Sequence, residues 1–307
     1  MIALVDLPSR RIEAWKYSDL ARAMDEDVQF VLKRDRTDPV VSATETRGGV
    51  IGALAAQAGV VDSLEVGAGA PVFRIDRPVY ANFEPRFLEV NIAPGGQLTR
   101  VVVQAAMEGG VVLDAAHVRI AAGGVFRQFV LAEGAKLARI ETRVEIEGEG
   151  AQLTLNGVYM AGAGRHADLT SVIDHTCARG TTRQLVKGAV RKGGRGVFQG
   201  KIVVERSAQG TDARQYHHGL LLEDGSEIFA KPELMIHADD VQCTHGNTAG
   251  GLDDNALFYL RSRGVPELEA RALLVEAFLA DAIPEGLPDE VTEELLGLIR
   301  RWCGGRP

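Results

Sequence analysis

The sequence is poor in cysteine and in aromatic residues, and it has no excess of positive charge. Its 307 residues include three cysteines, Cys177, Cys243 and Cys303, which indicates a reducing compartment and argues against a disulfide framework. Three thiolates are also too few for a metal site built from four thiolates of one chain. The net charge of −8, with no stripe of lysine and arginine, argues against binding to nucleic acid.

Long hydrophobic runs and targeting signals are also missing. The longest apolar stretch, Gly49–Val61, is too short and too often interrupted by glycine to cross a bilayer. Residues 1–8 show no basic segment followed by a hydrophobic stretch and a cleavage site, so no signal peptide is expected. We therefore expect a cytoplasmic protein without membrane contact, and its 46% hydrophobic residues suffice for a sizeable core.

The residue pattern divides the chain into a helical segment, a β-rich core and a helical tail, at residues 1–65, 66–251 and 252–307. In the first region, Ile12, Trp15 and Leu20 are spaced to share one face of a helix. Such aromatic residues are more often core than interface anchors. The alanine-rich stretch 48–59 predicts a second helix.

The middle region carries short apolar or alternating runs separated by turns that contain glycine, as at residues 126–131, 137–146 and 153–160. This pattern predicts an all-β domain, which can be a sandwich, a barrel or a β-helix. A β-helix is favoured because no strong Asn-Gly or Asp-Gly hairpin signal joins the long runs apart from Asp224–Gly225, and because repeated strand-and-glycine units are typical of solenoids. We expect helices to cap one or both ends of the solenoid, since an open end exposes strand edges.

The tail predicts three helices. Asp253–Asp254 can cap the first, Gly264 can end it, and Pro266 is expected at the first position of the second. The apolar stripes of the second and third helices are Leu268, Ala272, Val275 and Leu279, and Val291, Leu295, Leu298 and Trp302.

Candidate metal ligands gather in one window near the end of the β region. They are His217, His218, His237, Asp239, Asp240, Cys243 and His245. If residues 241–245 are extended, Cys243 and His245 project on the same face, two residues apart. A thiolate and an imidazole together are a partial site for iron or zinc. The alternative is a buried thiol beside a hydrogen-bonded histidine, which is the commoner situation.

Other motifs point to chemistry that the sequence does not support. The glycine-rich segment Gly194–Lys201 lacks the spacing of a phosphate loop, and Ile202 stands where the Ser or Thr ligand to magnesium is required. Gly162–Ala167 imitates part of a dinucleotide fingerprint without a helix after it. Asp239 and Asp240 are adjacent, so on a strand they point to opposite faces and cannot act as a hydrolase pair.

Leu257–Leu260 places four bulky residues in succession on a short predicted helix. Such a run covers all sides of the helix, so part of its surface must be buried elsewhere. Either the β domain or a partner protein covers it.

Six motifs follow one another along the chain: Arg10–Leu20, Gly200–Gln215, Lys231–Leu234, Ala238–Val241, Cys243–Gly246 and Ala256–Gly264. In this order they resemble the SufB/SufD family of iron–sulfur cluster assembly proteins. Gly246 after His245 is similar to the SufD branch, because SufB chains usually carry an acidic residue there. Asn247 departs from the family, which often has alanine at that position.

The resemblance implies a right-handed parallel β-helix flanked by N-terminal and C-terminal helical segments. It implies a scaffold without catalytic activity of its own, a heterodimer with SufB, and docking of the SufC ATPase. His245 and Cys243 are then expected near a transient cluster shared with SufB. The expected SufC-docking residues are Leu257, Phe258, Tyr259, Leu260 and Arg263. The cluster type, flavin binding and a homodimer in isolation are left open, and a self-contained metal-binding β-helix remains the alternative.

Overall fold

The computed structural model describes residues 7–24, 49–58, 61–78, 83 and 85–304. Its main body is a solenoid of fourteen strands, arranged as two sheets of seven. The first sheet contains β1 (Val61–Val66), β3 (Arg86–Ile92), β5 (Val111–Ile120), β7 (Leu137–Ile146), β9 (His166–His175), β11 (Arg195–Val204) and β13 (Glu227–Ile236). The second contains β2 (Val72–Asp76), β4 (Gln97–Gln104), β6 (Val125–Ala132), β8 (Gln152–Ala161), β10 (Thr181–Val190), β12 (Asp212–Leu221) and β14 (Gln242–Gly250).

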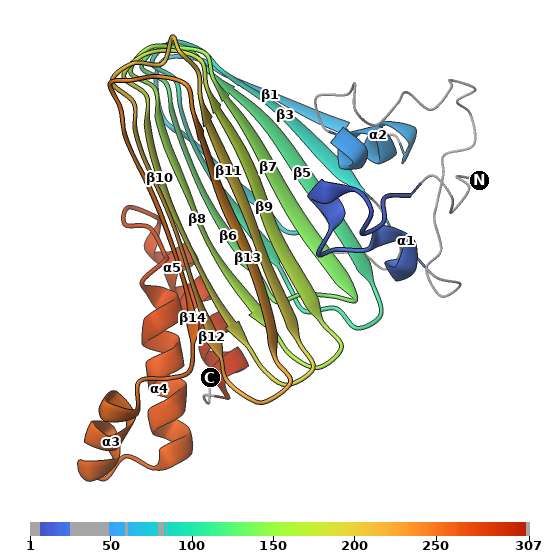
Figure 1. Ribbon diagram of the computed structural model, residues 1–307, viewed down its shortest axis with the longest axis vertical. Helices are drawn as coiled ribbons and strands as arrows, with labels where there is room; N and C mark the ends of the chain where they lie inside the picture. The colour runs from blue at the N-terminus through green and yellow to red at the C-terminus, as the bar shows by residue number, and fades with distance from the viewer. Residues whose placement is uncertain (1–6, 25–48, 59–60, 79–82, 84, 305–307) are drawn as a thin grey trace.

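Strands that follow one another in the sequence alternate between the two sheets, and the twelve strand pairings within the sheets are all parallel. The chain therefore winds as a parallel β-helix, in which each turn adds one strand to each sheet (Figure 1). The predicted fold class is confirmed. The expectation that helical segments flank the β-helix on its N-terminal and C-terminal sides is also confirmed.

The register stacks chemically similar side chains inside the solenoid. Val118, Val144, Ile173 and Ile202 occupy one column of the first sheet, and all four are fully buried. Complete burial of a side chain of this size contributes about 1.5–3 kcal/mol. A slip by one residue would turn every one of these side chains to the outside, so the apolar column fixes the register.

Glycine forms the corners between the strands. Gly193 and Gly225 have positive φ angles of 72° and 81°, which residues with a side chain rarely adopt. The Gly193 N–H donates to the Gly225 carbonyl at 3.0 Å, so successive corners stack as the strands do. Asp224–Gly225 therefore turns the chain from the second sheet into the first instead of closing a hairpin.

The N-terminal region differs from the single amphipathic helix expected around residues 12–20. It contains a 3₁₀ turn at Glu13–Trp15 and a short helix α1 (Leu20–Ala23). The Asp19 side chain accepts the Arg22 N–H at 3.0 Å and starts the new helix there. Trp15 is buried as core, whereas Ile12 is 48% exposed.

The second predicted helix of this region is confirmed as α2 (Gly49–Ala58). With Trp15 and Leu20, its residues Ile51 and Leu54 pack on the outer face of the first sheet. Residues 25–48, which belong to the same predicted segment, lie outside the described residues.

Three helices follow the solenoid, as the sequence predicts: α3 (Asp254–Ser262), α4 (Glu267–Ala280) and α5 (Asp289–Cys303). Asp253 caps α3 by accepting the Asn255 N–H at 2.8 Å, and Gly264 follows the helix with φ of 88°. Pro266 is the N-cap of α4, one position earlier than expected. Leu268 is 84% exposed, so the buried stripe of α4 begins after it.

The helices α4 and α5 cover a sheet face and not an end of the solenoid. Val275, Leu279, Leu295, Ile299 and Trp302 pack against the outward apolar row of the second sheet. Figure 1 shows α4 and α5 beside the solenoid, on the side away from α1 and α2. The expectation of a cap over the solenoid end is thus wrong for these helices, because the apolar outer face of the second sheet takes their buried stripe. Among the described residues, no helix is long and apolar enough to cross a membrane.

The division of the chain into units at residues 1–65, 66–251 and 252–307 stays a prediction. The last strand ends at Gly250 and α3 begins at Asp254.

Candidate functional site at the open end of the solenoid

The last turn of the solenoid leaves two strand edges open. β13 pairs with β11 and β14 pairs with β12, and each is the final described strand of its sheet. The residues of β13 and β14 are half-buried or exposed, in contrast to the buried strands before them. Such an edge presents unpaired N–H and C=O groups to another strand.

Cys243 and His245 lie on the same face of β14, as the spacing predicts for an extended strand. They pair in register with Ala213 and Gln215 of β12, which are fully buried and face the interior of the solenoid. We call Cys243, His245 and Asn247 the inward row of β14. His245 is exposed because no described strand covers it, whereas Cys243 is half-buried against the interior cluster.

Cys243 is held as a thiol. Burial raises the pKa of its thiol above the ordinary value of 9.0, and the negative charge of Asp212 raises it further, against a hydrogen bond to the Ala213 backbone that lowers it. A neutral thiol is a poor nucleophile and ligand. Cys243 can therefore bind a metal ion only by losing its proton to the metal.

The other histidines of the predicted window are placed apart from this pair. His217 is buried, with Nδ1 at 2.7 Å from Asn247 Oδ1 and Nε2 at 2.8 Å from the Tyr159 hydroxyl. Burial lowers the pKa of His217 to about 4, so the ring is neutral and structural. His218 points to the opposite face of β12 and has Nδ1 at 2.7 Å from Thr248 Oγ1.

His237, Asp239 and Asp240 lie in the corner between β13 and β14. The backbone of Asp240 holds this corner, since its N–H donates to Gln209 Oε1 at 2.9 Å and its carbonyl accepts the Gly210 N–H at 2.7 Å. In the described parts of the chain, no three His, Cys, Asp or Glu side chains are grouped so as to hold a metal ion.

The glycine-rich motifs are corners and strands. Gly194–Lys201 runs from a corner directly into β11, and Gly162–Ala167 joins β8 to β9. Neither segment opens a helix, which a phosphate or dinucleotide loop requires. Gly162–Ala167 contains a turn before a strand, whereas Gly194–Lys201 is not a turn, because β11 already begins at Arg195.

The predicted docking residues of α3 divide between the inside and the outside. Leu257 is buried, and Leu260 is half-buried. Phe258 and Tyr259 are 75% and 57% exposed, and the Arg263 guanidinium lies 5.2 Å from the centre of the Tyr259 ring. The exposed apolar surface of α3 is therefore concentrated on Phe258 and Tyr259.

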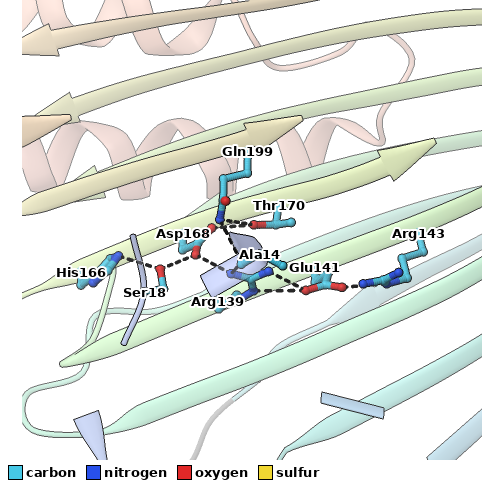
Figure 2. A network of polar contacts seen from close by, with 9 residues as sticks. All are labelled: Ala14, Ser18, Arg139, Glu141, Arg143, His166, Asp168, Thr170 and Gln199. Carbon is cyan, nitrogen blue, oxygen red and sulfur yellow. Dashed lines mark hydrogen bonds and ion pairs between the residues drawn. The ribbon is translucent and has the colours of Figure 1, made fainter. Parts of the chain in front are cut away.

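A buried polar network that sequence reasoning missed holds the N-terminal segment on the first sheet (Figure 2). Arg139 is 1% exposed and stands between two carboxylates, at 2.8 Å from Glu141 and 3.1 Å from Asp168. It also donates to the Ala14 carbonyl at 2.7 Å, and its guanidinium lies 4.1 Å from the centre of the Trp15 ring. In the sequence, Trp15 was the residue that could have pointed to this network. Its helical spacing instead predicted that it belongs to the buried face of a helix.

Ser18, His166 and Asp168 also meet in this network, in the residue types of a catalytic triad. Ser18 donates to Asp168, and His166 Nε2 lies 3.2 Å from the same hydroxyl. In a triad the carboxylate orients the histidine and not the serine, and the hydroxyl must be accessible. Ser18 is fully buried, so this arrangement anchors the segment and does not attack a substrate.

Comparison with known proteins identifies the family. A sequence model described as "SUF system FeS cluster assembly, SufBD core domain" matches residues 65–278. The iron–sulfur cluster assembly protein SufD of Escherichia coli (strain K12) is 36% identical over 174 residues, which cover 56% of this chain and 41% of that protein. A SufBD family protein of Mycobacterium tuberculosis (strain H37Rv) is 31% identical over 220 residues, which cover 69% of this chain and 55% of the relative.

The matched segments thus span about half the length of these curated relatives. The family model covers the solenoid from the end of β1 through most of α4, and with it Cys243, His245 and α3. On this match, and on the parallel β-helix that it accompanies, the chain belongs to the SufB/SufD family of iron–sulfur cluster assembly proteins.

Proposed function

We propose that this chain is a SufD-type scaffold subunit, without catalytic activity of its own, that shares a cluster-building site with a SufB-type partner. The observation that carries the proposal is the position of His245 and Cys243 on the inward row of an open edge strand. Iron and sulfide are the substrates of this site. The similarity to E. coli SufD supports the SufD branch of the family.

The open edges of β13 and β14 are the surface proposed for pairing. An added strand gains main-chain hydrogen bonds along an edge, and the side chains of the edge set the specificity. The edge also carries charge, since Lys231 of β13 pairs with Glu233 at 3.2 Å and with Glu13 at 2.6 Å. A SufB-type chain, which has the same fold family, can offer a matching edge.

A shared site explains why the ligands are few on this chain. Iron–sulfur clusters are held by four protein ligands, mostly thiolates, and Cys243 and His245 offer one thiol and one imidazole. The partner would provide the remaining thiolates. His245 would donate a ring nitrogen to iron or orient a ligand of the partner.

The helices α3 and α4 are proposed as the docking surface for the SufC ATPase. Phe258, Tyr259, Leu268 and Leu273 are large hydrophobic residues that remain exposed there. Aromatic residues of this kind are frequent anchors of protein interfaces. ATP hydrolysis would belong to SufC, and its cycle would open the SufB interface to iron and sulfide.

Co-purification tests the proposal. We expect the tagged chain to purify with SufB and SufC of its host and to yield a complex that contains iron and sulfide. A chain that binds neither protein and holds its own iron at a fixed ratio would support the alternative, a self-contained metal-binding β-helix. A homodimer that persists when SufB is supplied in excess would also contradict the proposed pairing.

A further inference from the structure

A column of six side chains, five of them polar, runs inside the second sheet from the interior of the solenoid to its open end. The register places each member of this column next to the following one along the sheet. In order, the column consists of Arg100, Gln128, Leu155, Gln184, Gln215 and His245. His245 is therefore the last member of an internal column.

Hydrogen bonds connect the last buried members of the column. Gln184 Nε2 donates to Ser171 Oγ of the facing sheet at 2.9 Å. Gln215 Nε2 donates to Gln184 Oε1, also at 2.9 Å. The amide N–H of Gln215 is thus directed to the member below it, and its carbonyl oxygen is left for another donor.

That carbonyl oxygen has no donor among the described residues. Gln215 is fully buried, and its Oε1 lacks a hydrogen-bond partner. The facing sheet has Gly200 at this level, where an added Cβ would collide with Gln215 Nε2. Buried acceptors are nearly always satisfied in folded proteins. The next polar side chain along the column is His245.

The neighbouring positions show that β12 and β14 do bond through side chains across this step. Asn247 Oδ1 lies 2.7 Å from His217 Nδ1, and Thr248 Oγ1 lies 2.7 Å from His218 Nδ1. Gln215 and His245 are paired in the same register, two residues before His217 and Asn247. In this inward pair, Gln215 has a carbonyl oxygen without a hydrogen-bond donor, and the residue paired with it, His245, has a ring that can supply an N–H.

We propose that Gln215 is the positioning residue of His245. In the structure His245 does not make this contact, and a rotation of its exposed side chain would let the Gln215 carbonyl oxygen accept a hydrogen bond from one ring N–H, which fixes the tautomer and the orientation of the ring. The other ring nitrogen then keeps its lone pair and points out of the open end, ready to act as a ligand. Histidines that bind metals are commonly held in this way by a second hydrogen bond. The use of that lone pair rests on the proposed function, whereas the hydrogen bond does not.

NMR of this chain with isotope-labelled histidine nitrogens tests the hydrogen bond. We expect one tautomer for His245 in the wild type and a mixture of both in Gln215→Met, which has the same length and no acceptor. His245→Ala assigns the signal. Gln128→Met is the matched control, because it removes an amide from the same column without removing a hydrogen-bond partner of Gln215. A tautomer mixture in the wild type contradicts the proposal and requires no variant to fold.

Cluster loading separates this inference from the proposed function. In the complex with SufB and SufC, we expect Gln215→Met to lower iron and sulfide content by roughly tenfold, and Gln128→Met to lower it much less. If His245→Ala abolishes loading while Gln215→Met changes neither tautomer nor loading, the positioning role is wrong and the function stands. If Gln215→Met changes the tautomer while neither Gln215→Met nor His245→Ala affects cluster loading, the positioning role stands and the proposed function of His245 is wrong.

Discussion

Arg139 shows how single residues hold this molecule together across more than a hundred positions of sequence. Its guanidinium is buried with Glu141 and Asp168 and donates to the Ala14 carbonyl. A buried charge of this kind is tolerated only when partners satisfy it, and removing one partner leaves the others uncompensated. Arg139 therefore secures the N-terminal segment to the first sheet.

We expect Arg139→Met to lower the free energy of unfolding by about 3–5 kcal/mol, because Glu141 and Asp168 then lose their buried counter-charge. Urea denaturation of both proteins measures the difference. Arg143→Met is the control: Arg143 pairs with the same Glu141 at 2.8 Å but is 37% exposed, so its loss is expected to cost less than about 1 kcal/mol. Equal effects of the two substitutions would contradict the role given to Arg139.

The effect of Arg139 depends on pH in a defined direction. Burial alone would raise the pKa of Glu141, but Arg139 and then Arg143 lower it to a net value below 4.5. A carboxylate with a depressed pKa in the folded state stabilises the protein above the unfolded pKa, and this stability is lost as the pH falls. We therefore expect the difference in free energy of unfolding between wild type and Arg139→Met to become smaller below about pH 4.5. Urea denaturation at several pH values measures it.

Some of the site could be predicted at the scale of the residue, and some could not. The common face of Cys243 and His245 follows from the period of a strand, which two residues suffice to define. The bond between His217 and Asn247 joins residues thirty positions apart. It depends on the length of one solenoid turn, which the local pattern does not give. Asn247, a departure from the family at the sequence level, is thus the partner of a buried histidine.

At the scale of the element, β14 has two backbone edges. One edge pairs with β12, and no described strand pairs with the other. The Gln242 N–H donates to the Thr211 carbonyl at 2.8 Å. In a parallel ladder the N–H groups of successive residues point to opposite sides of the strand, so those of Cys243, His245, Asn247 and Ala249 face the open edge. Ala249 is the member of this set that lies outside the candidate site and bonds to no side chain in the structure described.

We expect Ala249→Pro to abolish co-purification with SufB while the chain remains folded. Proline removes an N–H that no β12 carbonyl uses, and prolines are tolerated on the free side of edge strands. Circular dichroism and thermal melting check the fold. Thr248→Pro is the contrasting control, because it removes an N–H directed at β12 and is expected to destabilise the last turn. Undiminished binding of SufB by Ala249→Pro would argue against pairing through this edge.

In helix α3, the residues proposed for docking differ from those that contribute to the folded core. Phe258 and Tyr259 are exposed, whereas Leu257 of the same helix is buried. We expect the double substitution Phe258→Ser and Tyr259→Ser to weaken SufC binding at least tenfold in a titration, since exposed aromatic anchors contribute on the order of 2 kcal/mol or more when they lie at an interface. Leu257→Ser is expected to lower the melting temperature instead. Normal SufC affinity of the double variant would remove α3 from the docking surface.

The N-terminal segment shows where helix periodicity misleads. Ile12, Trp15 and Leu20 have helical spacing, yet the chain forms a 3₁₀ turn and then a short helix that starts at Asp19. Trp15 is fixed by stacking on Arg139, and Ser18 by its hydrogen bond to Asp168. These contacts come from distant strands, and they override the local preference for one continuous helix.

At the scale of the whole molecule, the parallel β-helix was predictable because each turn repeats the same local chemistry. Apolar residues such as Val144 and Ile173 stack on each other, and corner glycines such as Gly193 and Gly225 recur with positive φ. The position of the C-terminal helices was not predictable in the same way. Their apolar stripes could have covered either an end of the solenoid or a face of a sheet. They cover the outer face of the second sheet, because that face carries an apolar row.

At one end of the solenoid, two strand edges are covered by no described strand, and His245 is the last member of an internal column. The proposed function needs such a surface, because in it a second chain contributes to the same site. The most direct measurement is the iron and sulfide content of the purified complex with SufB and SufC, compared between wild type and His245→Ala. His218→Ala, on the opposite face of β12, is the matched control. We expect a loss of clusters in His245→Ala with the complex intact and normal content in His218→Ala; normal content in His245→Ala would contradict the shared site.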